Sequence, residues 1–150
     1  MQVAKQQFPD FEEFFRLLNV HKVKYLVVGG YAFAVHAYPR FTNDLDIWID
    51  TDVKNAEKIL QVLNDFGFKE LEVTIEDLTN PDRIIQLGYQ PLRIDLLTDI
   101  DGVDFSTAWG NKDYSSYGKQ KINIINRELF IRNKLASGRK KDKEDLEKLI

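Results

Sequence analysis

The sequence predicts an α+β fold in which helices pack on a small mixed β-sheet, within a single domain over residues 1–150. Two observations support this class. Short apolar segments of strand length alternate along the chain with longer segments whose apolar residues recur at helical spacing. Hydrophobic residues make up 43% of the 150, which is enough for one core in a chain of this length. We expect the C-terminal part of this domain, from about residue 127, to be helical.

The first half of the chain has the clearer pattern. Phenylalanines recur at helical spacing from residue 11 onward, and Asp10 with Glu13 resembles a capping box at the start of that helix. Gly29 and Gly30 turn the chain from a strand into a short helix, which Pro39 stops. The expected elements are a helix over about 10–19, a strand over 24–28, a short helix over 31–37, a strand over 45–50 and a helix over 53–66.

The second half of the chain has a less distinct pattern, above all over 69–90. Residues 79–82 are typical of a turn, and 99–118 is rich in Gly, Ser, Asp and aromatic residues, which favours an irregular surface segment. Gly138 separates two closing helices. The expected elements are a strand over 83–87, a strand over 92–97, an edge strand over 122–125 and helices over about 127–137 and 142–150.

The composition excludes several classes of protein. No run approaches the roughly 20 apolar residues of a membrane span. The absence of cysteine excludes disulfides and thiolate metal sites, and two histidines are too few for a typical zinc centre. The N-terminus lacks the basic start and apolar stretch of a signal peptide, so we expect a cytoplasmic protein.

The charge is unevenly distributed. A net charge of −3 argues against a general nucleic-acid coating protein, yet residues 132–143 hold six basic side chains against one acid, Asp142. Two interpretations stay open for this stretch. It is either a solvated connection between helices or a patch that faces a polyanion, such as a triphosphate or RNA.

Three acidic residues on two apolar segments carry the strongest functional signal. Asp44 and Asp46 lie within 43–49, and Asp95 lies within 92–97. The spacing of two places Asp44 and Asp46 on one face of a strand, and Asp95 completes a cluster if its strand pairs alongside. Such carboxylates are costly to bury and repel one another. One or two Mg²⁺ ions would relieve that repulsion, since Mg²⁺ prefers a few carboxylates together with phosphate oxygens.

This pattern indicates phosphoryl transfer chemistry. Two metal ions stabilise the attacking and leaving oxygens of an in-line displacement, and Asp95 could also take the proton of an acceptor hydroxyl. The pair Gly29-Gly30 supplies a second part of the site. A strand that ends in two glycines lets a phosphate approach the backbone, where the next helix offers free N–H groups.

Together these motifs resemble the nucleotidyltransferase superfamily, which has the polymerase-beta-like fold. The family pattern is a Gly-Gly or Gly-Ser turn, a hydrophobic-flanked Asp-x-Asp and a later third Asp; here these are Gly29-Gly30, Asp44-Leu45-Asp46 and Ile94-Asp95-Leu96. Residues 28–46 and 133–145 are similar to small bacterial stand-alone nucleotidyltransferases, including those of toxin–antitoxin pairs. The likeness spans roughly residues 23–147.

The resemblance implies roles for named residues. Asp44, Asp46 and Asp95 would be the catalytic acids and the metal ligands. The nucleotide would be held by Gly29, Gly30, Tyr31, Arg40, Lys134 and Arg139. Tyr31 departs from the pattern, since many relatives carry there a Ser whose hydroxyl touches phosphate. Lys134 is alternatively an exposed helix lysine, and Arg40 is alternatively an ion-pair partner of Asp44 or Asp46.

The resemblance also implies an activity. We expect a Mg²⁺-dependent enzyme, with Mn²⁺ as a substitute, that moves a nucleoside monophosphate from a nucleoside triphosphate such as ATP to a hydroxyl. The acceptor is an RNA, a protein or a small molecule, and a cognate antitoxin is a further candidate partner. The alternative is a non-catalytic module of the same fold that binds a nucleotide or a partner protein.

Overall fold

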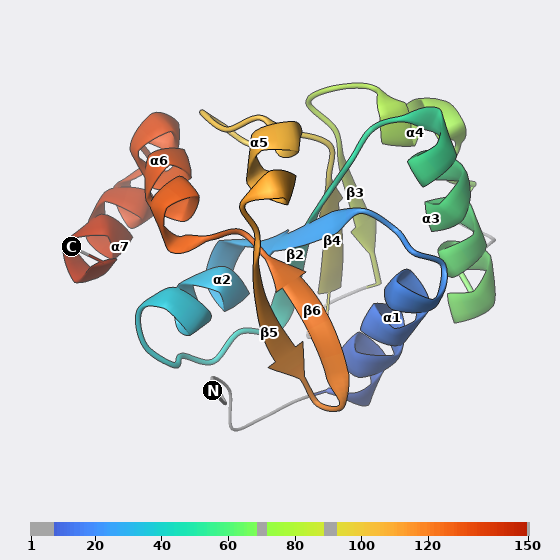
Figure 1. Cartoon of the computed structure of the whole chain (residues 1–150), viewed down its shortest axis with the longest axis horizontal. Helices are drawn as coiled ribbons and strands as arrows, with labels where there is room; N and C mark the ends of the chain where they lie inside the picture. The colour runs from blue at the N-terminus through green and yellow to red at the C-terminus, as the bar shows by residue number, and fades with distance from the viewer. Residues whose placement is uncertain (1–7, 69–71, 89–92, 150) are drawn as a thin grey trace.

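The computed structural model describes residues 8–68, 72–88 and 93–149 (Figure 1). Its centre is a six-stranded sheet in the order β3-β4-β2-β1-β6-β5. The pairs β2–β4 and β1–β6 are parallel and the other three pairs are antiparallel, so the predicted mixed sheet is confirmed. The strands are β1 (Tyr25–Val28), β2 (Asp44–Ile49), β3 (Ile84–Leu87), β4 (Arg93–Leu97), β5 (Asp113–Tyr117) and β6 (Gln120–Ile124).

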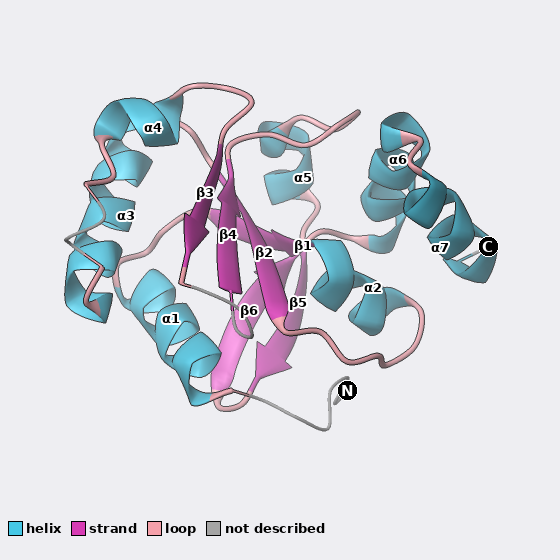
Figure 2. Ribbon diagram, turned by 180° about the vertical axis from the view of Figure 1, so that it is seen from behind, coloured by secondary structure: helices cyan, strands magenta, loops and turns pink. Residues whose placement is uncertain are grey.

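Helices surround this sheet (Figure 2). The helices α1 and α3 lie side by side near one end of the molecule, and α6 and α7 pack against each other at the opposite end. None of the described helices is long and apolar enough to span a bilayer. The helices are α1 (Pro9–Val20), α2 (Gly29–His36), α3 (Val53–Phe66), α4 (Ile75–Thr79), α5 (Phe105–Gly110), α6 (Arg127–Ser137) and α7 (Lys140–Leu149).

The core is built around the two central strands. All four residues of β1 are buried, and so are the apolar residues of β2. Trp48 of β2 is fully buried and packs edge-on against Phe105 of α5, with ring centroids 5.1 Å apart. The carboxylates of β2 therefore share their strand with a well-packed wall that holds them in place.

The helices α3 and α6 begin and end where the sequence predicts, because both have strong caps. The Asp52 carboxylate accepts a hydrogen bond from the Asn55 backbone N–H at 2.7 Å, and Gly67 ends α3 in the left-handed conformation. At α6, the Asn126 side chain accepts from the Leu129 N–H at 2.8 Å, and Gly138 ends the helix in the same way. The caps of α6 fix where the C-terminal helical pair begins.

The predicted capping box at Asp10 and Glu13 is wrong. Helix α1 begins at Pro9, with Phe8 as its N-cap residue and no side-chain cap. Glu13 instead accepts two hydrogen bonds from Arg16, at 2.6 and 2.8 Å. A proline at the first helical position already has the required backbone angle, so this helix can start without the box.

The predicted irregular segment over 99–118 is also wrong. It contains α5, whose N-cap Asp104 accepts from the Thr107 N–H at 2.9 Å, and the strand β5. Because β5 is an edge strand with mostly exposed side chains, its sequence is polar and lacks the apolar alternation of the other strands. Strand β6 is consequently an inner strand between β1 and β5, where the sequence predicted an edge.

Two smaller differences concern short elements. Helix α4, which the sequence pattern missed, has a complete capping box between Thr74 and Asp77. Helix α7 begins at Lys140, two residues before the predicted start. The predicted strand over 92–97 begins at Leu92, which lies outside the described residues.

Candidate active site

Four charged side chains form a square on one face of the paired strands β2 and β4. In this parallel pair Asp44 lies opposite Arg93, and Asp46 lies opposite Asp95. Residues that are directly opposite have Cβ atoms about 5 Å apart, and residues two apart on one strand share a face. The register thus places all three predicted acids beside one another, with an arginine at the fourth corner.

Asp46 is the least compensated of these acids. No hydrogen bond or ion pair reaches its carboxylate from the described residues, whereas Arg93 contacts both of the other acids. Burial, followed by the nearby charges of Asp95 and Asp44, raises the pKa of Asp46 to about 6. Asp46 is therefore the acid of this site whose negative charge has no ion-pair partner among the described residues.

Asp95 has both a raised pKa and a bound cation. Burial raises the pKa of its carboxyl, and Arg93 opposes that rise. Arg93 Nη2 donates to Asp95 Oδ2 at 3.1 Å, and Arg93 Nε lies 3.0 Å from Asp95 Oδ1. The second contact is an ion pair without hydrogen-bond alignment, since neither buried atom has a hydrogen-bond partner among the described residues. Asp95 Oδ1 thus keeps its capacity to accept a further hydrogen bond.

The glycine turn lies directly against Asp46. Gly29 follows β1 and begins α2 with a positive φ of 68°. A Cβ at this position would overlap Asp46 Oδ2 and lie 2.9 Å from its Cγ, so both the backbone angle and the close approach require glycine. Gly30 is less constrained, since a Cβ there would lie 3.3 Å from Thr42 Oγ1. Helix α2 therefore starts at Gly29, two residues before the predicted start, with no side-chain cap on its N-terminal N–H groups.

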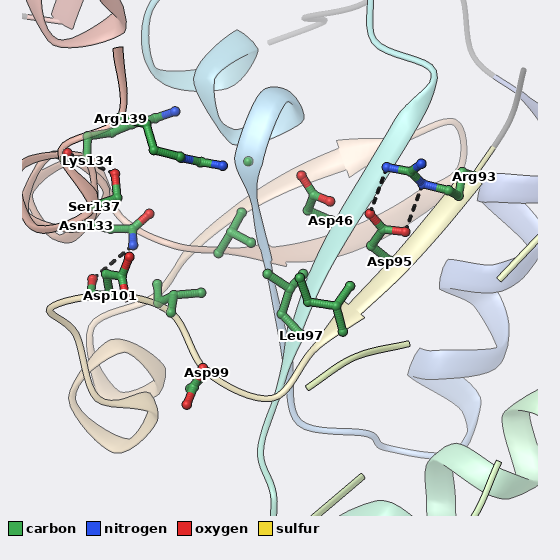
Figure 3. Close-up of a pocket in the computed structure, with 14 residues that line it drawn as sticks. Asp46, Arg93, Asp95, Leu97, Asp99, Asp101, Asn133, Lys134, Ser137 and Arg139 are labelled. Carbon is green, nitrogen blue, oxygen red and sulfur yellow. Dashed lines mark hydrogen bonds and ion pairs between the residues drawn. The ribbon is translucent and has the colours of Figure 1, made fainter. Parts of the chain in front are cut away.

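A cavity of about 430 Å³ opens over this face (Figure 3). Gly29, Asp46 and Asp95 line one part of it, and the loop acids Asp99 and Asp101 line another. The opposite wall comes from α6 and from Arg139, which follows the C-cap glycine of that helix, and Figure 3 shows this wall across the cavity from Asp46 and Asp95. These wall residues are Asn133, Lys134, Ser137 and Arg139.

Lys134 lies in this wall, but its ammonium group is already bound. Its side chain is only 7% exposed, and its Nζ donates to Asp142 Oδ1 at 2.8 Å and to Asp145 Oδ2 at 3.1 Å. These two aspartates of α7 are buried, and the surrounding basic side chains hold the pKa of each carboxyl below its usual value even though burial opposes this. Neither an exposed helix lysine nor an unpaired phosphate ligand describes Lys134 in this state.

The two predicted arginines belong to the same network. Arg139 is 76% exposed and donates from Nε to Asp142 at 2.8 Å. Arg40 donates to Asp145 at 3.2 Å and lies over the Phe33 ring at 4.0 Å, so its ion pair is with α7 and not with Asp44 or Asp46. The network joins three cations to two carboxylates and keeps a net charge of about +1 beside the cavity.

Tyr31 lies away from the cavity. Its side chain is buried against Tyr117, its hydroxyl donates to the Ser116 carbonyl at 3.4 Å, and burial raises its pKa to about 12. The departure from serine at this position therefore puts a core residue where a phosphate contact was expected. A nucleotide contact at this turn has to come from backbone N–H groups.

Sequence reasoning gave no role to three residues that shape the site. Arg93 had a visible signal, because it precedes Asp95 by two and must share its strand face. Asp142 and Asp145 had no local signal for burial, since four acids and four lysines alternate along α7 in a way that is typical of ordinary surface pairing. Only the packing of α7 on α6 shows that both are buried.

The donor set fits a divalent cation. No three acidic or histidine side chains of the described residues already converge as a ligand group, and Arg93 contacts both Asp44 and Asp95. The partly buried carboxylate of Asp46, which has no ion pair among the described residues, nevertheless offers beside Asp95 the oxygen donors and the negative charge that Mg²⁺ prefers. Asp44, Asp46 and Asp95 are the residues that would hold it.

Comparison with known proteins agrees with this fold. A family model described as aminoglycoside-2''-adenylyltransferase matches residues 11–114. A putative nucleotidyltransferase of Thermotoga maritima (TM1012) superposes with a TM-score of 0.63 at 20% identity, over 95% of this chain and 94% of that one. The lincosamide antibiotic adenylyltransferase LnuA, bound to lincomycin, gives 0.53 at 16% identity, over 97% and 98%.

A third solved structure has the same fold. An antigenic nucleotidyltransferase-like protein of Paracoccidioides brasiliensis gives a TM-score of 0.52 at 15% identity, over 93% of this chain and 74% of that one. No curated protein sequence matches the chain. The fold is that of the nucleotidyltransferases, and the chain belongs to the aminoglycoside-2''-adenylyltransferase family.

Proposed function

We propose that this protein transfers a nucleoside monophosphate, with ATP as the donor, to a hydroxyl of a small-molecule acceptor of the antibiotic type. The single observation that carries this proposal is Asp46, an uncompensated carboxylate that faces Asp95 and abuts the glycine turn inside the cavity. The choice of ATP and of an antibiotic acceptor is supported by the family description and by the lincomycin-bound neighbour.

The reaction has a simple balance. The acceptor oxygen forms a bond to the α-phosphorus of ATP, the bond from that phosphorus to the bridging oxygen breaks, and pyrophosphate leaves. Asp95 takes the hydroxyl proton, and burial raises its pKa in the direction that makes it a better base. A bound divalent cation would supply positive charge for the phosphate oxygens. Asp44, Asp46 and Asp95 would hold that cation.

The remaining residues would orient the triphosphate. Helix α2 begins at Gly29, against Asp46, with no side-chain cap on its N-terminal N–H groups, and anions bind readily at such a helix start. The network of Lys134, Arg139 and Arg40 keeps a positive charge beside the cavity, and Arg139 is exposed enough to reach a phosphate without unpacking. We therefore assign the phosphate tail to the space between the glycine turn and α6.

An adenylylation assay tests the proposal. The protein is incubated with Mg²⁺, labelled ATP and a panel of aminoglycosides and lincosamides, and the products are analysed by mass spectrometry for one added adenylyl group. Asp46→Asn keeps the side-chain shape and should abolish transfer, whereas Asp113→Asn on the exposed edge strand β5 should leave it unchanged. Mn²⁺ should replace Mg²⁺ in the same assay.

The outcomes separate the alternatives. Transfer that Asp46→Asn does not reduce would contradict the assigned site. ATP binding without turnover on any acceptor would favour the non-catalytic module. RNA and protein acceptors are included as further arms, because an RNA or protein target and a cognate antitoxin stay predictions from the sequence.

A further inference from the structure

Arg93 is the one basic side chain in the square of four charged residues on β2 and β4. It is directly opposite Asp44 and precedes Asp95 by two on the same strand, so its side chain rises from the same face as the three acids. Its guanidinium binds both oxygens of Asp95, at 3.0 and 3.1 Å, and lies 3.6 Å from Asp44 Oδ2. Figure 3 shows it folded over Asp95 rather than extended into the cavity.

The one positive charge of the square compensates its three acids unequally. Three carboxylates and one guanidinium leave a formal charge of −2 when all are ionised. The arginine compensates Asp95 and Asp44, and Asp46 stays without an ion pair among the described residues. The uncompensated charge is thus concentrated at one corner, diagonally across from Arg93.

The other cations that line the cavity cannot take this role. Lys134 and Arg139 are bound to Asp142, and Lys134 is also bound to Asp145. Both come from the C-terminal helical part, on the opposite wall of the cavity. Among the described lining residues, Arg93 is therefore the cation that contacts the acids.

We propose that Arg93 is the resident counter-ion of the acidic site and gives up part of its hold when a divalent cation binds. In the cation-free protein it keeps Asp44 and Asp95 together and fixes the orientation of the Asp95 carboxylate. It is a positioning residue, since it acts on substrate through Asp95. The inference rests on the proposed use of a divalent cation at these acids, but its test does not depend on turnover.

The geometry determines the direction of the effect. A divalent cation at the acids would share Asp44 and Asp95 with the guanidinium, and the two positive groups would repel one another. Removing the arginine should therefore lower the thermal stability of the cation-free protein and raise its affinity for the cation. A residue that only packed the fold would produce the first change without the second.

Mn²⁺ binding and thermal unfolding test this pair of effects. The variants are Arg93→Met, which keeps the side-chain length without the charge, and Arg93→Lys, which keeps the charge without the planar fork. Arg83→Met is the matched control, because Arg83 directly precedes the neighbouring strand β3 and does not line the cavity. Free Mn²⁺ is followed by electron paramagnetic resonance, and unfolding is measured in chelator and in saturating Mn²⁺.

Arg93→Met should unfold at a lower temperature than the wild type in chelator, should bind Mn²⁺ at least about tenfold more tightly, and should gain more thermal stability from Mn²⁺. Arg93→Lys should bind Mn²⁺ with nearly wild-type affinity, and Arg83→Met should match the wild type. If Arg93→Met does not fold in chelator, Arg93→Lys and Arg93→Gln provide the same comparison of affinities.

Two results would overturn the inference. One is an Arg93→Met affinity for Mn²⁺ that equals or falls below that of the wild type, with adenylyl transfer intact in the wild type; the proposed function would then stand without this role for Arg93. The other is the absence of Mn²⁺ binding by the wild type, which would remove the divalent cation from both proposals.

Discussion

Replacing Lys134 by methionine should destabilise the fold by about 3 kcal/mol. Its Nζ lies 2.8 Å from Asp142 Oδ1 and 3.1 Å from Asp145 Oδ2, and the two carboxylates have side chains only 1% and 3% exposed. Removing one partner of a buried ion pair costs about 3–5 kcal/mol, because the remaining charge is left buried without compensation. Arg139 and Arg40 stay bound to these aspartates, so we expect the low end of that range.

The assay is unfolding in urea followed by circular dichroism, together with thermal unfolding. For a chain of this length, about 3 kcal/mol corresponds to a decrease in Tm of roughly 6–12 °C. Lys143→Met is the control, because this exposed lysine lies on α7 outside the network, and exposed substitutions usually change stability by less than about 0.5 kcal/mol. The double variant Lys134→Met with Asp142→Asn should recover part of the loss, since it removes one of the uncompensated charges.

The pH dependence provides a second check. The folded state lowers the pKa of Asp142 and Asp145, so their contribution to stability is fully present above the unfolded value near 3.9 and is lost as the pH falls through the lower folded values. Without Lys134 this contribution shrinks. The stability difference between wild type and Lys134→Met should therefore narrow as the pH falls below about 4. A loss under about 1 kcal/mol at pH 7, or a difference that stays constant in acid, would refute the buried-network argument.

Three further substitutions test the acidic side of the site and the glycine turn. Gly29→Ala should lower stability by at least about 1–2 kcal/mol for the left-handed backbone alone, and should also weaken Mn²⁺ binding, because its Cβ displaces the Asp46 carboxylate. Urea unfolding and Mn²⁺ titration measure the two effects, and Gly110→Ala is the control, since a Cβ there meets no atom within 4 Å. Asp46→Asn should raise stability in chelator by about 1–2 kcal/mol, since it removes a partly buried charge whose pKa is raised to about 6, and should abolish stabilisation by Mg²⁺. An unchanged response to Mg²⁺ would show that the cation binds elsewhere. Tyr31→Phe should leave the KM for ATP unchanged and cost less than about 1 kcal/mol, because its hydroxyl makes one long hydrogen bond at 3.4 Å; a marked rise in KM would restore Tyr31 as a nucleotide contact.

The elements that could be predicted are those whose signals are local. Helices α3 and α6 have their caps and their apolar spacing written in adjacent residues, so their bounds follow from the sequence. Helix α5 has six residues and strand β5 is polar, so neither shows a period long enough to recognise. Their formation depends on Phe105 packing against Trp48 and on the pairing of β5 with β6.

The candidate site divides in the same way. The shared strand face of Asp44 and Asp46, and the glycine turn before them, can be inferred from the local sequence, because a spacing of two and a glycine pair are properties of neighbouring residues. The position of Asp95 opposite Asp46 could not be inferred in this way, since the pairing of β2 with β4 joins segments separated by more than forty residues.

The pairing of the basic side chains likewise depends on contacts between distant segments. The sequence placed several basic residues near the C-terminus but could not say which of them are already paired. The packing of α7 on α6 buries Asp142 and Asp145 and binds Lys134, Arg40 and Arg139 to them, while the strand register places Arg93 against Asp44 and Asp95. Charged groups pair over a few ångströms in space, so only the folded chain determines which basic side chains are already paired and which acids are left without an ion pair.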